Sequence, residues 1–304
     1  NVHSGSDDQT VRKIDPNGNE VWSFTGHSDR VWGVAVDGAG NVHSASSDNT
    51  VRKIDPNGNQ VWSFEGHTSS VRGVAVDDAG NVYSGSDDQT VRKIDPSGNQ
   101  VWSFTGHSSI VLGVAVDDAG NVYSGSSDHT VRKIDPNGNE VWSFTGHTNN
   151  VYGVAVDDAG NVYSGSSDHT VRKIDPNGNE VWSFTGHTNN VYGVAVDDAG
   201  NVHSGSDDQT VRKIDPNGNE VWSFTGHSSI VFGVAVDDAG NVYSGSSDNT
   251  VRKIDPDGNQ AWSFTGHTDW VWPVTVDANG NVYSGGYDAT VRKLRQTSDT
   301  CTSD

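Results

Sequence analysis

Histidine and aspartate recur along the chain as pairs with constant spacing. The histidines are His27, His67, His107, His147, His187, His227 and His267, and the aspartates that follow them are Asp48, Asp88, Asp128, Asp168, Asp208, Asp248 and Asp288. A serine such as Ser44 stands between the two members of each pair, and serine, histidine and aspartate together form nucleophilic triads in enzymes. An enzyme needs one distinctive site, whereas these residues occur in seven copies. We therefore expect a structural role for these residues, and no catalytic residue.

A second pattern of oxygen-bearing side chains resembles a calcium loop only in part. Asp55, Asn57 and Asn59 alternate with Pro56 and Gly58, and most repeats contain the same segment. Calcium loops also need a later glycine and a bidentate glutamate downstream, and neither is in place. Proline and glycine at these positions favour a reverse turn. We predict a hairpin turn with no metal and no cofactor.

The charge balance of the chain excludes several classes of partner. Aspartate and glutamate number 40 against 19 lysines and arginines, a net charge of −21. Affinity for nucleic acids and for anionic membrane surfaces depends on clustered lysine and arginine, so we expect neither partner. No apolar segment approaches the ~20 residues of a membrane-spanning helix, so membrane insertion is not expected.

These residues are positioned by a repeat of 40 residues. Asn-Val recurs at 1, 41, 81 and onward, and residues 121–160 are identical to residues 161–200. Within one unit we predict strands at 31–37, 42–46, 50–55 and 60–64, which we call a, b, c and d, separated by turns rich in Gly, Asn and Asp. Four short strands joined by short turns form an antiparallel meander, and units of this length are typical of propeller blades. The predicted fold is an all-β propeller with four-stranded blades.

The number of blades depends on the incomplete units at the two ends. Strands b and c occur eight times, and strands a and d seven times. We favour eight blades, of which the first lacks its inner strand and the last its outer strand, with seven blades as the alternative. The propeller is expected to span residues 1–294 and to be followed by a flexible tail, residues 295–304, that contains a free thiol at Cys301. An open blade edge could also accept a strand from a neighbour and lead to oligomers.

Three segments resemble known propeller families. Gly26-His27 with Asp48–Asp55 resembles the WD repeat, although Ile54 stands where that family usually has tryptophan. This resemblance implies that each repeated histidine is hydrogen-bonded to the aspartate that follows it and stabilises its blade. Residues 73–83 look like an NHL repeat, and residues 55–62 look like the tryptophan-docking segment of propellers related to quinoprotein dehydrogenases. All three resemblances imply a propeller. The third raises the question of a quinone cofactor, which we do not expect because such a site needs special residues and these units are nearly identical.

Differences between the repeats are concentrated in two places. The first is the d–a loop and the start of strand a, where the varied residues are Arg30, Trp32, Arg72, Ile110, Leu112, Asn150, Tyr152, Asn190, Tyr192, Ile230, Phe232, Trp270 and Trp272. The second is the b–c turn, at Gln9, Asn49, Gln89, His129, His169, Gln209, Asn249 and Ala289. Alternate turns of a meander emerge at opposite ends, so both groups lie on one face of the predicted disc.

Large aromatic and arginine side chains are those that binding surfaces use. We therefore predict a non-enzymatic scaffold that recognises a protein, peptide or glycan through this face. The alternative is a structural protein that assembles into oligomers or fibres through the same face or through open blade edges. A lectin with one site per repeat is a third reading, but it requires identical residues in every copy.

The start of the chain gives a weak expectation about localisation. The sequence contains no methionine, so Asn1 is not a translational start and the chain is either processed or partial. This leans towards a secreted or extracellular protein; no signal peptide is visible in the given residues, but one could belong to the missing part.

Overall fold

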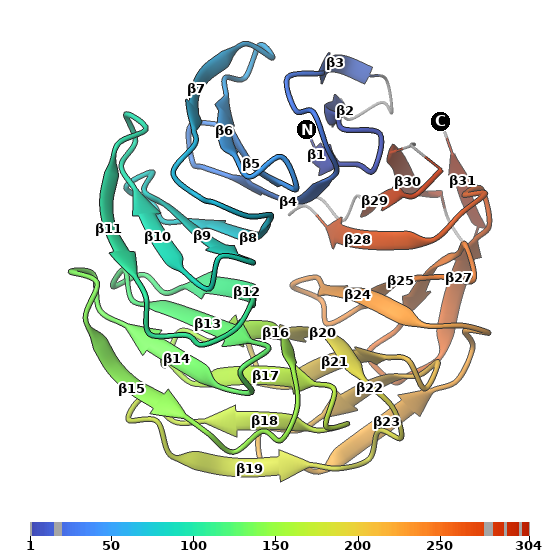
Figure 1. Cartoon of the computed structure of the whole chain (residues 1–304). Coiled ribbons are helices and arrows are strands. Elements are labelled where there is room, and N and C mark those ends of the chain that lie inside the picture. Colours follow the sequence, from blue (N-terminus) through green and yellow to red (C-terminus); the bar gives the residue numbers. More distant parts are fainter. Residues whose placement is uncertain (1, 15–19, 277–281, 289–290, 298–299, 304) are drawn as a thin grey trace.

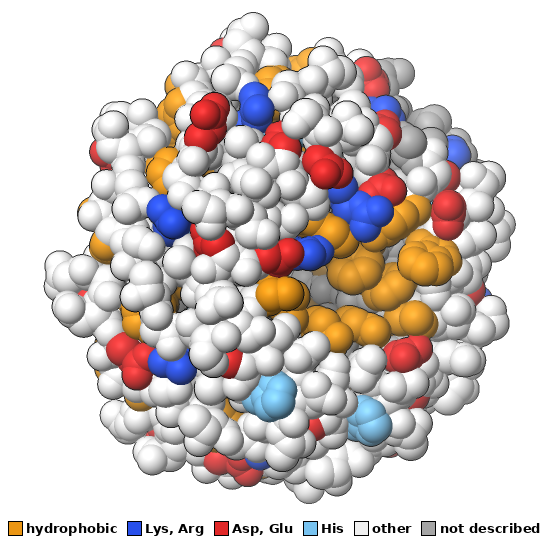
Figure 2. Space-filling view, viewed as in Figure 1, with side chains coloured by type: hydrophobic (Ala, Val, Ile, Leu, Met, Phe, Trp, Pro, Cys, Tyr) orange, Lys and Arg blue, Asp and Glu red, His pale blue; other side chains and the backbone are white. Residues whose placement is uncertain are grey.

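The computed structural model describes residues 2–14, 20–276, 282–288, 291–297 and 300–303, and within these ranges it describes the backbone alone for residues 2–4, 14, 273, 291, 293, 295–297 and 300–303. Every regular element in this part of the chain is a β-strand. None of the described residues belongs to a helix that could cross a membrane. The sheets stand side by side in a ring (Figure 1). The space-filling view shows a hollow at the centre of the ring, which we call the channel (Figure 2).

Seven sheets have four antiparallel strands each, which follow one another from the channel to the rim. The innermost strands, in position a, are β4 (Val31–Val36), β8 (Val71–Val76), β12 (Val111–Val116), β16 (Val151–Val156), β20 (Val191–Val196), β24 (Val231–Val236) and β28 (Val271–Val276). The next strands, in position b, are β5 (Val42–Ser46), β9 (Val82–Ser86), β13 (Val122–Ser126), β17 (Val162–Ser166), β21 (Val202–Ser206), β25 (Val242–Ser246) and β29 (Val282–Gly286).

The two outer positions complete these sheets. Strands in position c are β6 (Val51–Ile54), β10 (Val91–Ile94), β14 (Val131–Ile134), β18 (Val171–Ile174), β22 (Val211–Ile214), β26 (Val251–Ile254) and β30 (Val291–Thr297). Strands in position d are β7 (Gln60–Phe64), β11 (Gln100–Phe104), β15 (Glu140–Phe144), β19 (Glu180–Phe184), β23 (Glu220–Phe224), β27 (Gln260–Phe264) and β31 (Thr300–Ser303).

One further sheet has three strands, β1 (Val2–Gly5), β2 (Val11–Ile14) and β3 (Glu20–Phe24). They take the b, c and d positions, and β1 contacts both β4 and β29, so this sheet stands in the ring between the second and the last sheets (Figure 1). The predicted all-β propeller is confirmed. Its complete four-stranded blades number seven, as in the alternative prediction, and the three-stranded sheet lacks an inner strand in the described part of the chain.

The prediction for the end of the chain needs a correction. The last sheet was expected to lack its outer strand, but β31 pairs with β30 from Leu294 opposite Ser303 to Thr297 opposite Thr300. Residues placed in the tail therefore extend the propeller beyond residue 294. The repeat pattern could not reveal this strand because its sequence differs from that of every other d strand, whereas the unpaired edge of β30 accepts any segment with a compatible backbone. The thiol of Cys301 lies outside the described side chains.

The turns agree with the Gly and Asn spacing of the repeat. Gly40 has a φ of 80° and donates its N–H to the carbonyl of Asp37, 2.9 Å away, which closes the a–b turn. The side chain of Asp37 accepts the Asn41 N–H at 2.8 Å. Glycine takes this left-handed conformation without a steric penalty. The strand boundaries in the unit differ from the predicted ones by one residue at the end of a and at each end of c.

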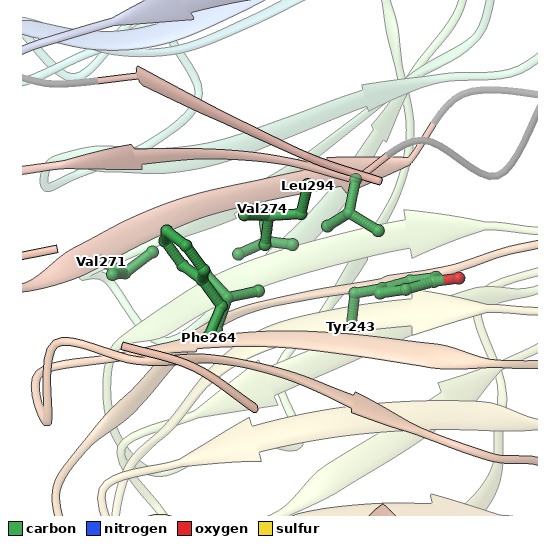
Figure 3. Close-up of a cluster of buried hydrophobic side chains, with 7 residues drawn as sticks. Tyr243, Phe264, Val271, Val274 and Leu294 are labelled. Carbon is green, nitrogen blue, oxygen red and sulfur yellow. The ribbon is translucent and has the colours of Figure 1, made fainter. Parts of the chain in front are cut away.

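The hydrophobic core is divided among the interfaces between successive sheets. Figure 3 shows one such cluster, in which Tyr243 and Phe264 of one sheet face Val271, Val274 and Leu294 of the next. These side chains come from all four strand positions. Every second side chain of a strand points to the same face, so each strand contributes residues to the interface. Each sheet therefore buries its apolar residues against the next one around the ring.

Tryptophan residues of the outer strands also join neighbouring sheets. The Nε1 of Trp142 donates to the carbonyl of Pro176 at 3.0 Å, in the c–d turn of the next sheet. The same turn contains Gly178, where an added Cβ would lie 2.8 Å from the Trp142 ring. The tryptophan-docking segment anticipated from the sequence is therefore a contact between sheets, and it requires glycine at this position.

Candidate interaction face

The structure brings each expected histidine and aspartate together with the serine between them, and it adds a threonine. In one copy, His107 Nδ1 lies 2.8 Å from Asp128 Oδ2 and His107 Nε2 lies 2.8 Å from Ser124 Oγ. The Thr130 hydroxyl donates to Asp128 at 2.6 Å, and the Ser108 N–H donates at 3.0 Å. The other His–Asp pairs have the same contact, at 2.8 Å for five of them and at 3.0 Å for His267 and Asp288.

The hydrogen bonds define the protonation state of this network. A carboxylate only accepts, so the His107 Nδ1 that faces Asp128 carries a proton and donates it. Burial would raise the pKa of Asp128, but the hydrogen bonds from His107 and Thr130 outweigh it and hold that pKa well below its usual range. Burial lowers the pKa of His67, which favours the neutral ring. The Ser124 side chain is fully buried, so this arrangement stabilises the b–c turn and offers no nucleophile to solvent.

A second kind of His–Asp contact was not anticipated. His43 and His203 occupy a position in strand b that is tyrosine in five other repeats, and Tyr83 illustrates the difference. The Tyr83 hydroxyl donates to Asp77 at 2.9 Å, whereas His43 Nε2 lies 3.3 Å from Asp37. The other ring nitrogen of His43 is buried without a hydrogen-bond partner. Comparison of the repeats with one another shows the substitution, but only the fold shows that the position is buried.

The segment that resembles a calcium loop is a hydrogen-bonded turn. Asp55 Oδ1 accepts the N–H groups of Asn57 and Asn59 at 2.8 Å, and the Asn59 amide donates to Asp55 Oδ2 at 3.0 Å. These are the side-chain-to-backbone contacts of a turn. Within the described ranges, no three residues among His, Cys, Asp and Glu gather in a group that could hold a metal ion.

The varied residues of strand a sit at a β-bulge. In the pair β16 and β17, Val151 is opposite Ser166 and Gly153 is opposite Gly165, so Tyr152 is the extra residue. The same shift occurs in five other a–b pairs, at Trp32, Arg72, Leu112, Tyr192 and Phe232. In the last pair the register shifts between Val271 and Val274, a segment that includes Trp272. A bulge turns a side chain away from the regular alternation of the strand. This local geometry directs the varied residues to the mouth of the channel.

Hydrophobic side chains gather around the hollow at the centre of the molecule (Figure 2). The aromatic bulge residues of successive sheets also contact one another. The ring centroids of Tyr152 and Tyr192 are 4.8 Å apart, those of Tyr192 and Phe232 are 5.5 Å apart, and those of Phe232 and Trp272 are 4.3 Å apart. The ring of Trp272 also contacts that of Trp32, with the ring centroids 6.3 Å apart. These two residues come from the sheets on either side of the three-stranded sheet. We call these five residues the aromatic arc.

Exposure differs among the predicted face residues. Trp270 is 45% exposed and packs against Phe232 at 5.9 Å and against Tyr287 at 5.6 Å. Phe232 is only 6% exposed, so it supports its neighbours and presents little surface of its own. Arg30, Trp32, Arg72, Ile110, Leu112, Asn150, Tyr152, Asn190, Tyr192, Ile230 and Trp272 are half-buried.

One side of the mouth carries charge. The guanidinium of Arg72 makes two hydrogen bonds to Asp87, each 2.7 Å long, and it also lies 4.4 Å from the centre of the Trp32 ring. Arg30 stacks on the same ring at 4.7 Å and forms an ion pair with Asp7. Both arginines are therefore held in place beside an aromatic plane, as in the cation–π contacts of recognition sites.

The loop residues before strand a fix the neighbouring b–c turns. The carbonyls of Ile110, Asn150 and Ile230 accept N–H groups from residues 127, 167 and 247 at 2.8–2.9 Å. The varied residues of the b–c turns themselves have a positive φ, which is 70° at both Gln89 and His129. Residues other than glycine are uncommon in this conformation, and asparagine, aspartate and histidine are the most frequent among them. Ala289 falls outside the described residues.

Comparison with known proteins identifies the family to which the chain belongs. The family model described as "Outer membrane protein assembly factor BamB" matches residues 7–123, 47–165 and 167–286. This match fits the expectation of quinoprotein-type repeats. No curated protein matches the chain. A crystal structure of the computationally designed Ika8 protein is 29% identical to it, covers 96% of this chain and 92% of that chain, and gives a TM-score of 0.86.

Proposed function

Because the chain belongs to the family described as outer membrane protein assembly factor BamB, we propose that it is a non-enzymatic scaffold that binds a protein or peptide partner at the channel mouth. The family description names an assembly factor, and an assembly factor acts by contacting other proteins. The propeller fold is compatible with this role. Fold alone does not specify function, so the proposal depends on the site.

The observation that carries the proposal is the aromatic arc beside two immobilised arginines. Trp32, Tyr192 and Trp272 are half-buried, and Trp270 at the edge of the arc is 45% exposed. Tryptophan, tyrosine and arginine are the residues that contribute most to protein interfaces. Their side chains are already held by stacking and ion pairs, so little conformational entropy is lost when a partner binds.

The test uses peptides selected for binding from a displayed random library. Tyr192→Ser and Trp272→Ser should each weaken binding of the selected peptides by about tenfold or more, because each removes an aromatic contact of ~1.5–3 kcal/mol. Val141→Ser is the matched control, since Val141 is 53% exposed on the outer strand β15, away from the channel. Binding that survives both arc variants unchanged would show that the partner does not use this face.

One observation favours assembly as a second candidate function. A regular row of valines on the outer strands is exposed by 50–54%, namely Val21, Val61, Val101, Val141, Val181 and Val221. Outer strands are also the edges of their sheets, where strands of another copy could pair. Light scattering across a range of concentrations tests this candidate: a strict monomer contradicts assembly, and oligomers that dissociate when Val101, Val141 and Val181 are replaced by serine support it.

A further inference from the structure

We propose that the partner of the channel mouth presents an arginine, whose guanidinium pairs with the carboxylate of Asp207 and stacks beside the rings of Tyr152 and Tyr192. The inference rests on the proposed function and deepens it, because it names the side chain that the same face recognises. It comes from a comparison of two sheets whose b–c turns are identical in sequence, at residues 84–90 and 204–210.

The first of these sheets already binds an arginine of the chain itself. Asp87 in its b–c turn accepts two hydrogen bonds of 2.7 Å from Arg72, the bulge residue of the same sheet. The guanidinium also lies 4.4 Å from the centre of the ring of Trp32, the bulge residue of the preceding sheet. A guanidinium has a planar fork of donors that matches a carboxylate and a flat face that stacks on aromatic rings. The channel mouth thus contains a complete arginine site formed within the chain.

The second sheet contains the same aspartate without the arginine. Its b–c turn has the same backbone conformation as the first, with a φ of 70° at both Gln89 and Gln209. The bulge residue, however, is Tyr192 in place of Arg72. Within the described ranges, the carboxylate of Asp207 forms no ion pair with a basic side chain and accepts no hydrogen bond. Its backbone therefore presents the carboxylate as in the first sheet, but the chain supplies no cation to it.

The other sheets show that aspartate at this position goes together with arginine. Four sheets have serine there, and none of them has arginine as its bulge residue; these serines are Ser47, Ser127, Ser167 and Ser247. Asp7 of the three-stranded sheet forms an ion pair with Arg30, which stacks on the Trp32 ring at 4.7 Å. In two sheets the chain thus provides the arginine for the aspartate. For Asp207, a partner can provide it.

The surroundings of Asp207 suit a guanidinium. The rings of Tyr152 and Tyr192 are half-buried, and their centroids are 4.8 Å apart. Burial raises the pKa of Tyr192 against a hydrogen bond from Asn190 that lowers it, and the charge of Asp207 adds to the increase, as expected for a carboxylate near this ring. Asp207 is itself half-buried, so a bound cation would be partly shielded from water, which strengthens the attraction.

Charge also favours a basic partner over an acidic one. The chain has a net charge of −21, which attracts positively charged segments and repels acidic ones during encounter. Arginine fits this site better than lysine, because an ammonium group has neither the planar fork of donors nor the flat face. The specificity of the site should therefore distinguish the two basic side chains.

The experiment uses the full chain and peptides selected from a displayed random library for binding to it. We expect the selected peptides to share one arginine. Replacing that arginine by glutamine, or introducing Asp207→Asn, should each weaken binding by about tenfold, since a charge-assisted pair of hydrogen bonds is lost. The two changes combined should weaken binding little more than either one alone. Replacing the arginine by lysine should weaken binding by about threefold.

Asp198→Asn is the matched control for the change in charge. It removes one negative charge from the same sheet, but Asp198 is exposed in the a–b turn at the opposite end. Because Asp207→Asn breaks no contact within the described chain, urea unfolding should give both variants the stability of the wild type.

The outcomes separate this inference from the proposed function. Selected peptides that lack a shared arginine, or equal affinities of the Asp207→Asn and Asp198→Asn proteins, overturn the inference; the proposed function then survives if Tyr192→Ser and Trp272→Ser still weaken binding. If those two arc variants bind the peptides as the wild type does, or if no peptide is selected, the proposed function fails and the inference fails with it.

Discussion

The rings of Phe232 and Trp272 stack at a centroid distance of 4.3 Å with an angle of 21° between their planes. These residues are 40 positions apart in the sequence and come from successive sheets. Phe232 is buried and Trp272 is half-buried, so the first supports the second. Stacking of this kind contributes ~0.5–1.5 kcal/mol beyond the buried area.

Phe232→Leu tests whether the buried ring positions Trp272. The repeat already has leucine at the equivalent Leu112, so the backbone tolerates it. We expect a loss of about 1 kcal/mol in the free energy of unfolding and a loss of affinity for selected peptides of about threefold to tenfold. Leu112→Phe is the reciprocal control, because it adds a ring outside the aromatic arc. Equal affinity of the Phe232→Leu protein and the wild type would show that the stack has no part in binding.

His43→Tyr should stabilise the protein, and more so in acid. Burial lowers the pKa of His43 to about 4, against a hydrogen bond to Asp37 that raises it and the charge of Lys53 that lowers it. The folded state therefore binds fewer protons than the unfolded state between about pH 6.5 and pH 4, and stability falls as the pH falls through this range. The variant also removes a buried nitrogen that has no hydrogen-bond partner.

We expect a gain of about 1 kcal/mol at pH 7 from the removed nitrogen, and a further gain of about 2 kcal/mol at pH 5 from the removed titration. Urea unfolding at the two pH values measures both. Tyr83→His is the reverse control and should introduce the same acid sensitivity. A gain that is the same at pH 7 and pH 5 would contradict the assignment of the titration to His43.

Asp128→Asn should destabilise its sheet by about 2–4 kcal/mol. The carboxylate accepts from His107, Ser108 and Thr130, and an amide offers one acceptor oxygen and two additional donors. Asp8→Asn is a matched control, because it is the same substitution at an equivalent position where none of the described histidines contacts the carboxylate. Amide hydrogen exchange in β13 and β14 should accelerate in the first variant only. Equal effects of the two variants would mean that the histidine contributes nothing to the turn.

Gly178→Ala should disrupt the contact between its turn and the preceding sheet. The residue has a φ of 89°, and the new Cβ would lie 2.8 Å from the Trp142 ring. A strained φ and a steric clash together should cost about 2–4 kcal/mol, seen as a lower melting temperature. Gly38→Ala is the control, since nothing lies within 4 Å of its added Cβ. A similar melting temperature for both variants would contradict the docking role of the turn.

The repeat itself predicted much of the local structure. Turn residues such as Gly40 and Gly58 separate strand segments of four to six residues, and this spacing determines the strands, their antiparallel order and the face on which the varied residues emerge. The pairing of His107 with Asp128 was likewise expected, from the resemblance to WD repeats. Such features depend on short-range backbone geometry, which each copy of the repeat encodes independently.

The tertiary structure decided the features that depend on contacts between copies or at the ends of the chain. The bulge that directs Tyr152 to the channel is a shift in pairing and has no sequence signature of its own. Trp32 meets Trp272 only because the ring brings the second and last sheets together. β31 forms because an unpaired edge strand accepts a segment whose sequence differs from the repeat. A sequence of nearly identical units specifies the unit, whereas ring closure, edge pairing and the composition of the channel mouth arise only when the units pack against one another.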